Sequence, residues 1–207
     1  MKKPATLLLF AFLVSCSGNK NEESNSSDKK YDLESGIITF STTMKIGERN
    51  ITQKKILYFE DYGIRECEEE YTVDTASGQE ILDSKTFVKD GYYYTCSIAD
   101  KTGVKTKTSG YGVATSFRMH KDSTAEGKKY AELDTEKICG KSCDAFSMES
   151  PSGTITQYGW KRILLKTIFI NPATKTYSET VAIKIEENVS IPSDKFEIPD
   201  EVVIKDM

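Results

Sequence analysis

The feature that most constrains the fold of this chain is a succession of short runs, rich in β-branched and aromatic residues, that begins at Tyr31. Glycine, aspartate and serine separate the runs at short intervals, which is typical of an antiparallel meander. The expected strands are 36–43, 54–60, 64–73, 81–88, 92–98, a short one around Val104, 145–149, 154–160, 163–170 and 176–185. The sequence therefore predicts a mostly β protein with a minor helical part (α+β), folded as a single domain over residues 31–207.

Two local signals add detail to this pattern. The Asp90-Gly91 step predicts a tight hairpin, because both residues tolerate a positive φ. Ser123, followed three residues later by Glu126, fits a capping box, so a helix is expected over 123–137.

Residues 1–15 have the composition of a signal peptide. Lys2 and Lys3 precede an uncharged apolar stretch that is shorter than the ~20 residues that a membrane-spanning helix needs. The stretch ends in Leu-Val-Ser-Cys at 13–16, which resembles the bacterial lipobox. This resemblance implies cleavage before Cys16 and attachment of lipid to its thiol. A plain signal peptide followed by a chance cysteine is the alternative.

Residues 16–30 are expected to form a lipidated, flexible tether. From Ser17 to Lys30 there is no aliphatic or aromatic side chain, so the segment has little surface to bury against the cost of ordering it. We therefore expect a protein of the bacterial envelope that is held to a membrane by its N-terminal lipid and does not thread through it. Ser17, where an aspartate would favour the inner membrane, favours the outer membrane. The periplasmic and surface faces both stay open.

Charge and residue types argue against several functions. A formal net charge of −4 gives no basic stripe for nucleic acid. The single histidine, His120, excludes a multi-histidine metal site, and no Gly-x-Ser-x-Gly elbow accompanies it. We expect no enzymatic activity, no cofactor and no metal. The acidic run of Glu66, Glu68, Glu69 and Glu70 leaves cation binding as an alternative to a solvated strand face.

Four cysteines remain once Cys16 is set aside. An even number of cysteines in an exported domain predicts disulfides, with three alternative pairings. We favour Cys67–Cys96, on successive strands, and Cys139–Cys143, across a bent loop that contains a glycine. A four-thiolate zinc site or a redox centre would need closer spacings than these.

Three segments in the last third of the chain carry a family-like pattern. They are Cys-Gly-Lys-Ser-Cys-Asp-Ala-Phe at 139–146, Tyr-Gly-Trp-Lys-Arg-Ile-Leu-Leu-Lys at 158–166, and Ile-Pro-Ser-Asp-Lys-Phe-Glu-Ile-Pro at 191–199. Over residues 138–199 the chain resembles the LolA/LolB-like lipoprotein-carrier superfamily and its uncharacterised outer-membrane lipoprotein relatives. Pro192 and Pro199 cannot donate to a sheet ladder, so the segment between them should lie at the surface, with Phe196 packed inward.

The resemblance implies a strongly curved antiparallel sheet, an incomplete barrel, with one or two helices closing its concave side around an apolar cavity. It also implies an acyl chain or another hydrophobic ligand in that cavity. The residues expected to line the cavity are Trp160, Ile163, Leu165, Phe169, Val181 and Ile183. The alternative is a structural or interaction lipoprotein with a packed interior that binds another envelope protein.

Overall fold

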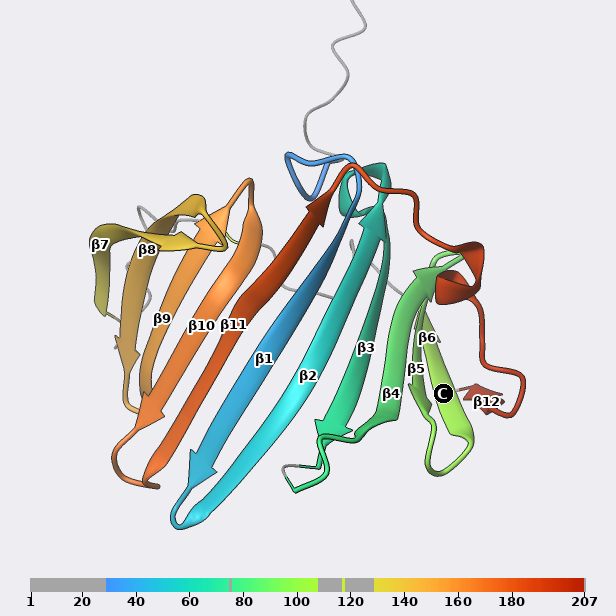
Figure 1. Ribbon diagram of the computed structural model, residues 1–207, viewed down its shortest axis with the longest axis horizontal. Helices are drawn as coiled ribbons and strands as arrows, with labels where there is room; N and C mark the ends of the chain where they lie inside the picture. Colours follow the sequence, from blue (N-terminus) through green and yellow to red (C-terminus); the bar gives the residue numbers. More distant parts are fainter. Residues whose placement is uncertain (1–28, 75, 108–116, 118–128, 207) are drawn as a thin grey trace, which may run out of the picture.

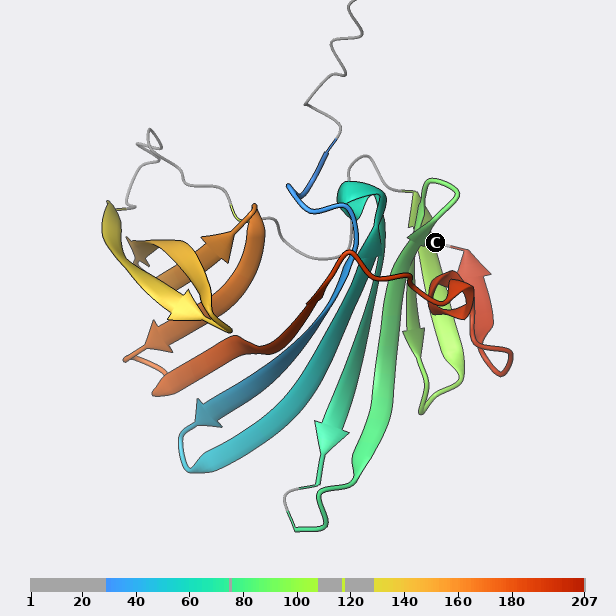
Figure 2. The ribbon, with the colours of Figure 1, turned by 45° about the horizontal axis from the view of Figure 1, so that its top comes forward.

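The computed structural model describes residues 29–74, 76–107, 117 and 129–206. Within these residues, twelve strands form one sheet in the order β12-β6-β5-β4-β3-β2-β1-β11-β10-β9-β8-β7. All neighbouring strands are antiparallel except β12 and β6, which are parallel. The sheet is open and curled (Figures 1 and 2). The expected mostly β class and curved sheet are therefore confirmed.

The strands are β1 (Gly36–Ile46), β2 (Arg49–Glu60), β3 (Arg65–Val73), β4 (Glu80–Lys89), β5 (Tyr92–Ser97), β6 (Thr102–Lys107), β7 (Lys129–Ile138), β8 (Lys141–Ser150), β9 (Gly153–Trp160), β10 (Ile163–Asn171), β11 (Thr176–Glu187) and β12 (Val203–Asp206). Two short 3-10 turns, η1 (Asp61–Gly63) and η2 (Ser193–Phe196), complete the described elements. In this part of the chain, no helix is long and apolar enough to cross a membrane.

The predicted helix over 123–137 is wrong from Lys129 onward, and its first residues lie outside the described part of the chain. Lys129–Ile138 is strand β7, which pairs with β8. Cys139 and Gly140 join the two strands with φ values of 48° and 76°, the left-handed pair that a tight hairpin turn needs. Pairing with β8 therefore overrides a weak capping signal. One or two helices closing the sheet are likewise not found among the described residues.

Tight turns of this kind recur along the sheet. Asp90 and Gly91 have φ values of 52° and 75° between β4 and β5, which confirms the hairpin predicted there. Lys161 and Arg162 make the same turn between β9 and β10, with φ values of 49° and 61°. No glycine or asparagine marks this second turn, so local sequence hardly indicates it.

The central strands are buried on both faces. Along β2, Leu57 and Phe59 belong to one core cluster, whereas Tyr58 belongs to the other, as the two-residue period of a strand requires. We call these two sides the Phe59 face and the Tyr58 face. The Phe59 face of β1 carries Ile38 and Phe40.

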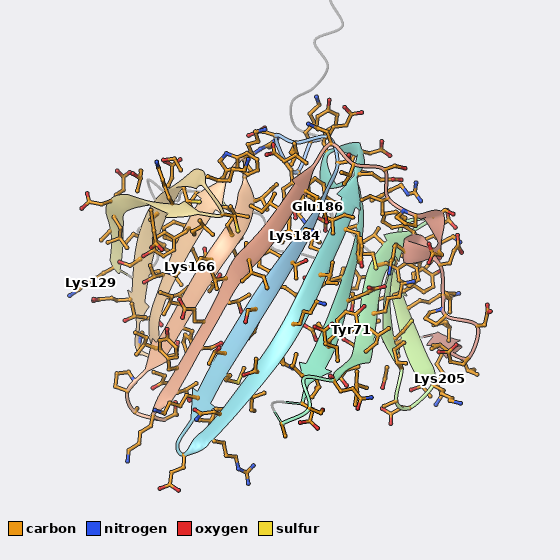
Figure 3. All side chains as sticks on the ribbon, in the orientation of Figure 1. Tyr71, Lys129, Lys166, Lys184, Glu186 and Lys205 are labelled. Atoms are coloured by element: carbon orange, nitrogen blue, oxygen red, sulfur yellow. The ribbon has the colours of Figure 1, made fainter. Side chains whose placement is uncertain are left out.

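The C-terminal segment covers part of the Tyr58 face. Phe196, in η2, is buried in the cluster that contains Tyr58, as predicted. The Lys195 ammonium donates to both carboxylate oxygens of Glu69, at 2.8 and 3.1 Å, and the Tyr58 hydroxyl donates to the same carboxylate. On β11, which precedes this segment in the chain, Lys184 and Glu186 form an exposed ion pair (Figure 3).

Candidate functional site

A cavity of about 240 Å³ lies on the Phe59 face, where β1, β2, β10 and β11 meet. Its apolar walls are Tyr31, Phe40, Leu57, Ile163, Leu164 and Leu165. Its polar walls are Lys55, Glu68, Lys166, Thr167 and Thr180. The cavity is therefore amphipathic, apolar over one part and hydrogen-bonding over the other.

Residues 30–35, which we call the strap, cross one end of the sheet and supply the Tyr31 wall. The backbone N–H groups of Lys30 and Tyr31 donate to the carbonyl of Tyr62, in η1. At the other side, the N–H of Asp32 donates to the carbonyl of Lys161, in the β9–β10 turn. The strap thus ties two turns that lie on opposite sides of β1 and β11.

The Tyr31 ring is fixed from two directions. It meets the Phe59 ring edge-on, with centroids 5.0 Å apart. Gly63 lies against it so closely that a β-carbon there would come within 2.6 Å of the ring. Burial, together with the neighbouring Glu66 carboxylate, raises the pKa of Tyr31 well above its ordinary value, so the hydroxyl stays neutral.

A buried ion pair fastens the start of the strap. The Lys30 ammonium lies 2.8 and 2.7 Å from the two carboxylate oxygens of Glu66, on β3. Only 4% of the Lys30 side chain and none of the Glu66 side chain is exposed. Lys30 is therefore part of the folded domain, although its polar neighbours in the sequence assigned it to the tether.

The predicted lining residues fall into two groups. Ile163 and Leu165 do line the cavity. Trp160 and Val181 are half-buried and pack against the core cluster that surrounds it. The ammonium groups of Lys141 and Lys161 also lie over the Trp160 ring, 4.8 and 4.5 Å from its centroid.

The last two predicted lining residues lie elsewhere. Phe169 is half-buried further along β10, beyond the described walls of the cavity. Ile183 is 58% exposed. A register shift opposite Thr39 and Phe40 leaves Ile183 unpaired with β1, and this bulge breaks the alternation from which its burial was expected.

The four cysteines of the domain are free thiols. Strand β4 lies between Cys67, on β3, and Cys96, on β5. Two strand spacings amount to ~10 Å, beyond the ~7 Å across which a disulfide can form, so the predicted Cys67–Cys96 pairing disagrees with the strand register. The Cys139–Cys143 pairing stays a prediction, with Cys139 exposed in the β7–β8 turn and Cys143 buried on β8.

The acidic run that allowed cation binding is neutralised by lysines. Besides the Glu66–Lys30 pair, Glu68 lies 3.1 Å from Lys55 and Glu69 lies 2.8 Å from Lys195. Among the described residues there is no group of side chains that could hold a metal ion. His120 and Cys16 lie outside the described part of the chain.

No family model matches this chain, and no curated protein does. Among solved structures, an uncharacterized conserved protein from Thermus thermophilus superposes with a TM-score of 0.53 at 7% identity, over 83% of this chain and 90% of that one. MucB in complex with MucA(peri) gives a TM-score of 0.51 at 13% identity, over 86% of this chain. The MucA/MucB complex of Pseudomonas aeruginosa superposes about equally well, with a TM-score of 0.50 at 12% identity over 82% of this chain.

These likenesses show the fold alone, because the identities are so low. The chain spans 58% of the MucB chain, so it matches only part of that protein. The structural neighbours also include a domain described as an outer membrane lipoprotein-sorting protein, from Vibrio parahaemolyticus, at 11% identity and a TM-score of 0.37, over 79% of this chain and 89% of that one. The open, curled sheet is thus a fold that this chain shares with MucB and with the Thermus thermophilus protein.

Proposed function

We propose that this protein is a membrane-anchored lipoprotein of the bacterial envelope that binds an acyl chain or a similar hydrophobic ligand on the Phe59 face and catalyses no reaction. The observation that supports this proposal is the apolar part of the cavity, where Tyr31, Phe40, Leu57 and Leu165 surround a space of about 240 Å³. A space with such walls is a favourable place for an apolar group.

The volume sets the size of the ligand. An engineered apolar cavity of about 150 Å³ holds benzene, and pockets for drug-sized ligands begin at about 300 Å³. The space on the Phe59 face lies between these sizes. It therefore suits one short chain or the end of a longer one, and each buried methylene would contribute ~0.8 kcal/mol to binding.

The tether keeps the cavity near the membrane. If Cys16 is lipidated, thirteen residues, 17–29, connect it to the strap. A flexible chain of that length has an average end-to-end distance of about 20 Å. Because the strap forms one wall of the cavity, the ligand site lies at the end of the domain where the tether enters. We propose the outer membrane as its location, on either face.

A protein-binding role is the second candidate. MucB, whose fold this chain resembles, has been solved in complex with MucA(peri). In that case the interior of this protein would serve only its stability, and another envelope protein would bind to its outer surface.

Ligand extraction separates the two candidates. Residues 17–207 are exported behind a cleavable leader that lacks the lipidated cysteine, which keeps every described residue and gives an unacylated protein. Its folding is checked by a cooperative thermal transition in Trp160 fluorescence. We expect organic-solvent extracts to contain lipid by mass spectrometry, and a fluorescent fatty acid to bind to the delipidated protein. Absence of both lipid and probe binding in a folded protein contradicts the carrier proposal.

A cavity-filling variant tests the location of the site. Thr167→Trp places a large side chain in the cavity wall and should abolish probe binding. Thr43→Trp changes an exposed residue on β1 and is the matched control.

The lipid anchor is tested in the complete chain. Cells grown with an alkyne-bearing fatty acid should label the protein, and Cys16→Ser should remove the label. A Cys16→Ser protein that stays labelled contradicts the lipidation proposal.

A further inference from the structure

A row of hydroxyl and amide side chains crosses the Phe59 face next to the apolar walls of the cavity. The strand register aligns Gln157 with Thr167, Thr167 with Thr180, Thr180 with Thr42, and Thr42 with Gln53. Residues that face each other across antiparallel strands point to the same side of the sheet, so the five side chains form one polar row. We call it the hydroxyl row.

The hydroxyl row lies directly beside the apolar part of the cavity. Thr42 follows Phe40 on the same face of β1, and Thr167 and Thr180 themselves line the cavity. A ligand whose apolar chain lies against Phe40 and Leu57 would therefore place its next atoms over these threonines.

The threonine hydroxyls retain hydrogen-bonding capacity for a ligand. The Oγ1 atoms of Thr42 and Thr180 lie 2.9 Å apart, so one hydroxyl donates to the other. Such a pair keeps one free O–H and several acceptor lone pairs. It can accept from and donate to a neutral polar group at the same time.

The charged walls of the cavity favour a neutral ligand. Lys55 lies 3.1 Å from Glu68, and both residues line the cavity. A carboxylate or phosphate in the cavity would have to compete with Glu68 for the Lys55 ammonium, and separating this partly buried pair would leave the Glu68 charge uncompensated. A hydroxyl-bearing head avoids this cost.

Accepting the proposed ligand site, we infer that its ligand is a single-chain amphiphile with a neutral, hydroxyl-bearing head of the monoacylglycerol type. The acyl chain lies against Phe40, Leu57 and Leu165, and the head hydroxyls bond to Thr42, Thr167 and Thr180. The threonines thus determine head-group specificity, whereas the apolar walls provide most of the affinity.

Calorimetry with two chain-matched amphiphiles tests this inference. Monolauroylglycerol and laurate are titrated, below their critical micelle concentrations and near neutral pH, into the delipidated unacylated protein. We expect monolauroylglycerol to bind about tenfold more tightly, which corresponds to one or two net hydrogen bonds. Thr42→Val and Thr180→Val, which remove a hydroxyl at constant shape, should each weaken monolauroylglycerol binding about fivefold and leave laurate binding unchanged.

Two controls keep the result interpretable. Thr43→Val changes the next residue of β1, which faces the other side of the sheet, and should leave both affinities unchanged. Thr180→Ser keeps the hydroxyl and should keep the preference, even if a valine variant fails to fold.

Each outcome decides between the proposals. If neither amphiphile binds to the folded protein, the ligand site itself is wrong. If both bind equally, or laurate binds more tightly, or the valine variants keep the preference, the cavity stands but the neutral-head inference is overturned.

Discussion

Removing the cation from the buried Lys30–Glu66 pair should be one of the most destabilising single substitutions in this protein. Both carboxylate oxygens of Glu66 accept from the Lys30 ammonium, and the Glu66 side chain is fully buried. Burial lowers the pKa of Lys30, although the Glu66 carboxylate opposes this effect. Lys30→Met would leave a carboxylate without its cation in the core.

The expected magnitude follows from the burial of the pair. Breaking a buried ion pair by removing one partner costs about 3–5 kcal/mol. For a domain of this size, each kcal/mol lowers Tm by about 2–4 °C, so Lys30→Met should lower Tm by roughly 6–20 °C. Replacing both partners, as in Lys30→Met/Glu66→Leu, removes the stranded charge and should restore most of the loss.

Urea and thermal unfolding, followed by circular dichroism, measure these effects. The exposed pair Lys54–Glu80, with side chains 27% and 42% exposed, is the matched control. Lys54→Met should cost no more than ~1 kcal/mol, because solvent screens surface pairs. If Lys30→Met costs no more than Lys54→Met, or the double variant is no more stable than the single one, the strap is not held by this pair.

Three further predictions concern other contacts. Burial acts to raise the pKa of Glu69, but hydrogen bonds from Lys195 and Tyr71 outweigh it and lower the pKa below 4.5. The stability that Glu69 contributes is therefore present above about pH 4.5 and lost as pH falls through its folded pKa. Urea unfolding should show that the free energy of unfolding falls less on acidification in Glu69→Gln than in the wild type. In the reduced protein, iodoacetamide should modify exposed Cys139 long before Cys67, whose pKa burial raises to about 12, as peptide mass spectrometry would show. Gly159→Ala should cost about 1–3 kcal/mol in thermal unfolding, because its β-carbon would lie 1.9 Å from a ring atom of Phe117.

Each of these three predictions would be contradicted by a specific result. If acidification lowers the free energy of unfolding equally in Glu69→Gln and in the wild type, Glu69 does not cause the pH dependence. Equal alkylation rates for the two cysteines would show that Cys67 is accessible. A Gly159→Ala protein as stable as the wild type would show that the aromatic ring yields easily.

Local patterns in the sequence predicted much of the sheet. Strand β2 ends in a short apolar run, Ile56–Phe59, because its last residues are buried on both faces. Strand β4 turns into β5 where Asp90 and Gly91 accept positive φ. The prolines that flank residues 193–198 predict a surface segment, and Phe196 is the apolar residue of this segment that packs inward, as predicted. In each case the physical cause acts within a few residues, so the sequence displays it.

The candidate site could be predicted only in part. Ile163 and Leu165 belong to an apolar run, and both line the cavity. Ile183 belongs to a similar run, but a bulge relative to β1 exposes it. Lys30 and Tyr31 contribute the ion pair and a wall of the cavity, yet a lysine at the end of a polar tether gives no sign of burial.

The sequence by itself determined which segments form most of the strands and where many of the turns between them lie. It also gave the N-terminal residues their resemblance to the leader of an exported, lipidated protein. Only the tertiary structure decided that β1 pairs with β11, which brings residues about 140 positions apart into register and places Thr42 beside Thr180. It also decided that β7 is a strand, and that the strap crosses the sheet end. These features depend on pairings between distant strands, whose energies are not carried by either strand alone.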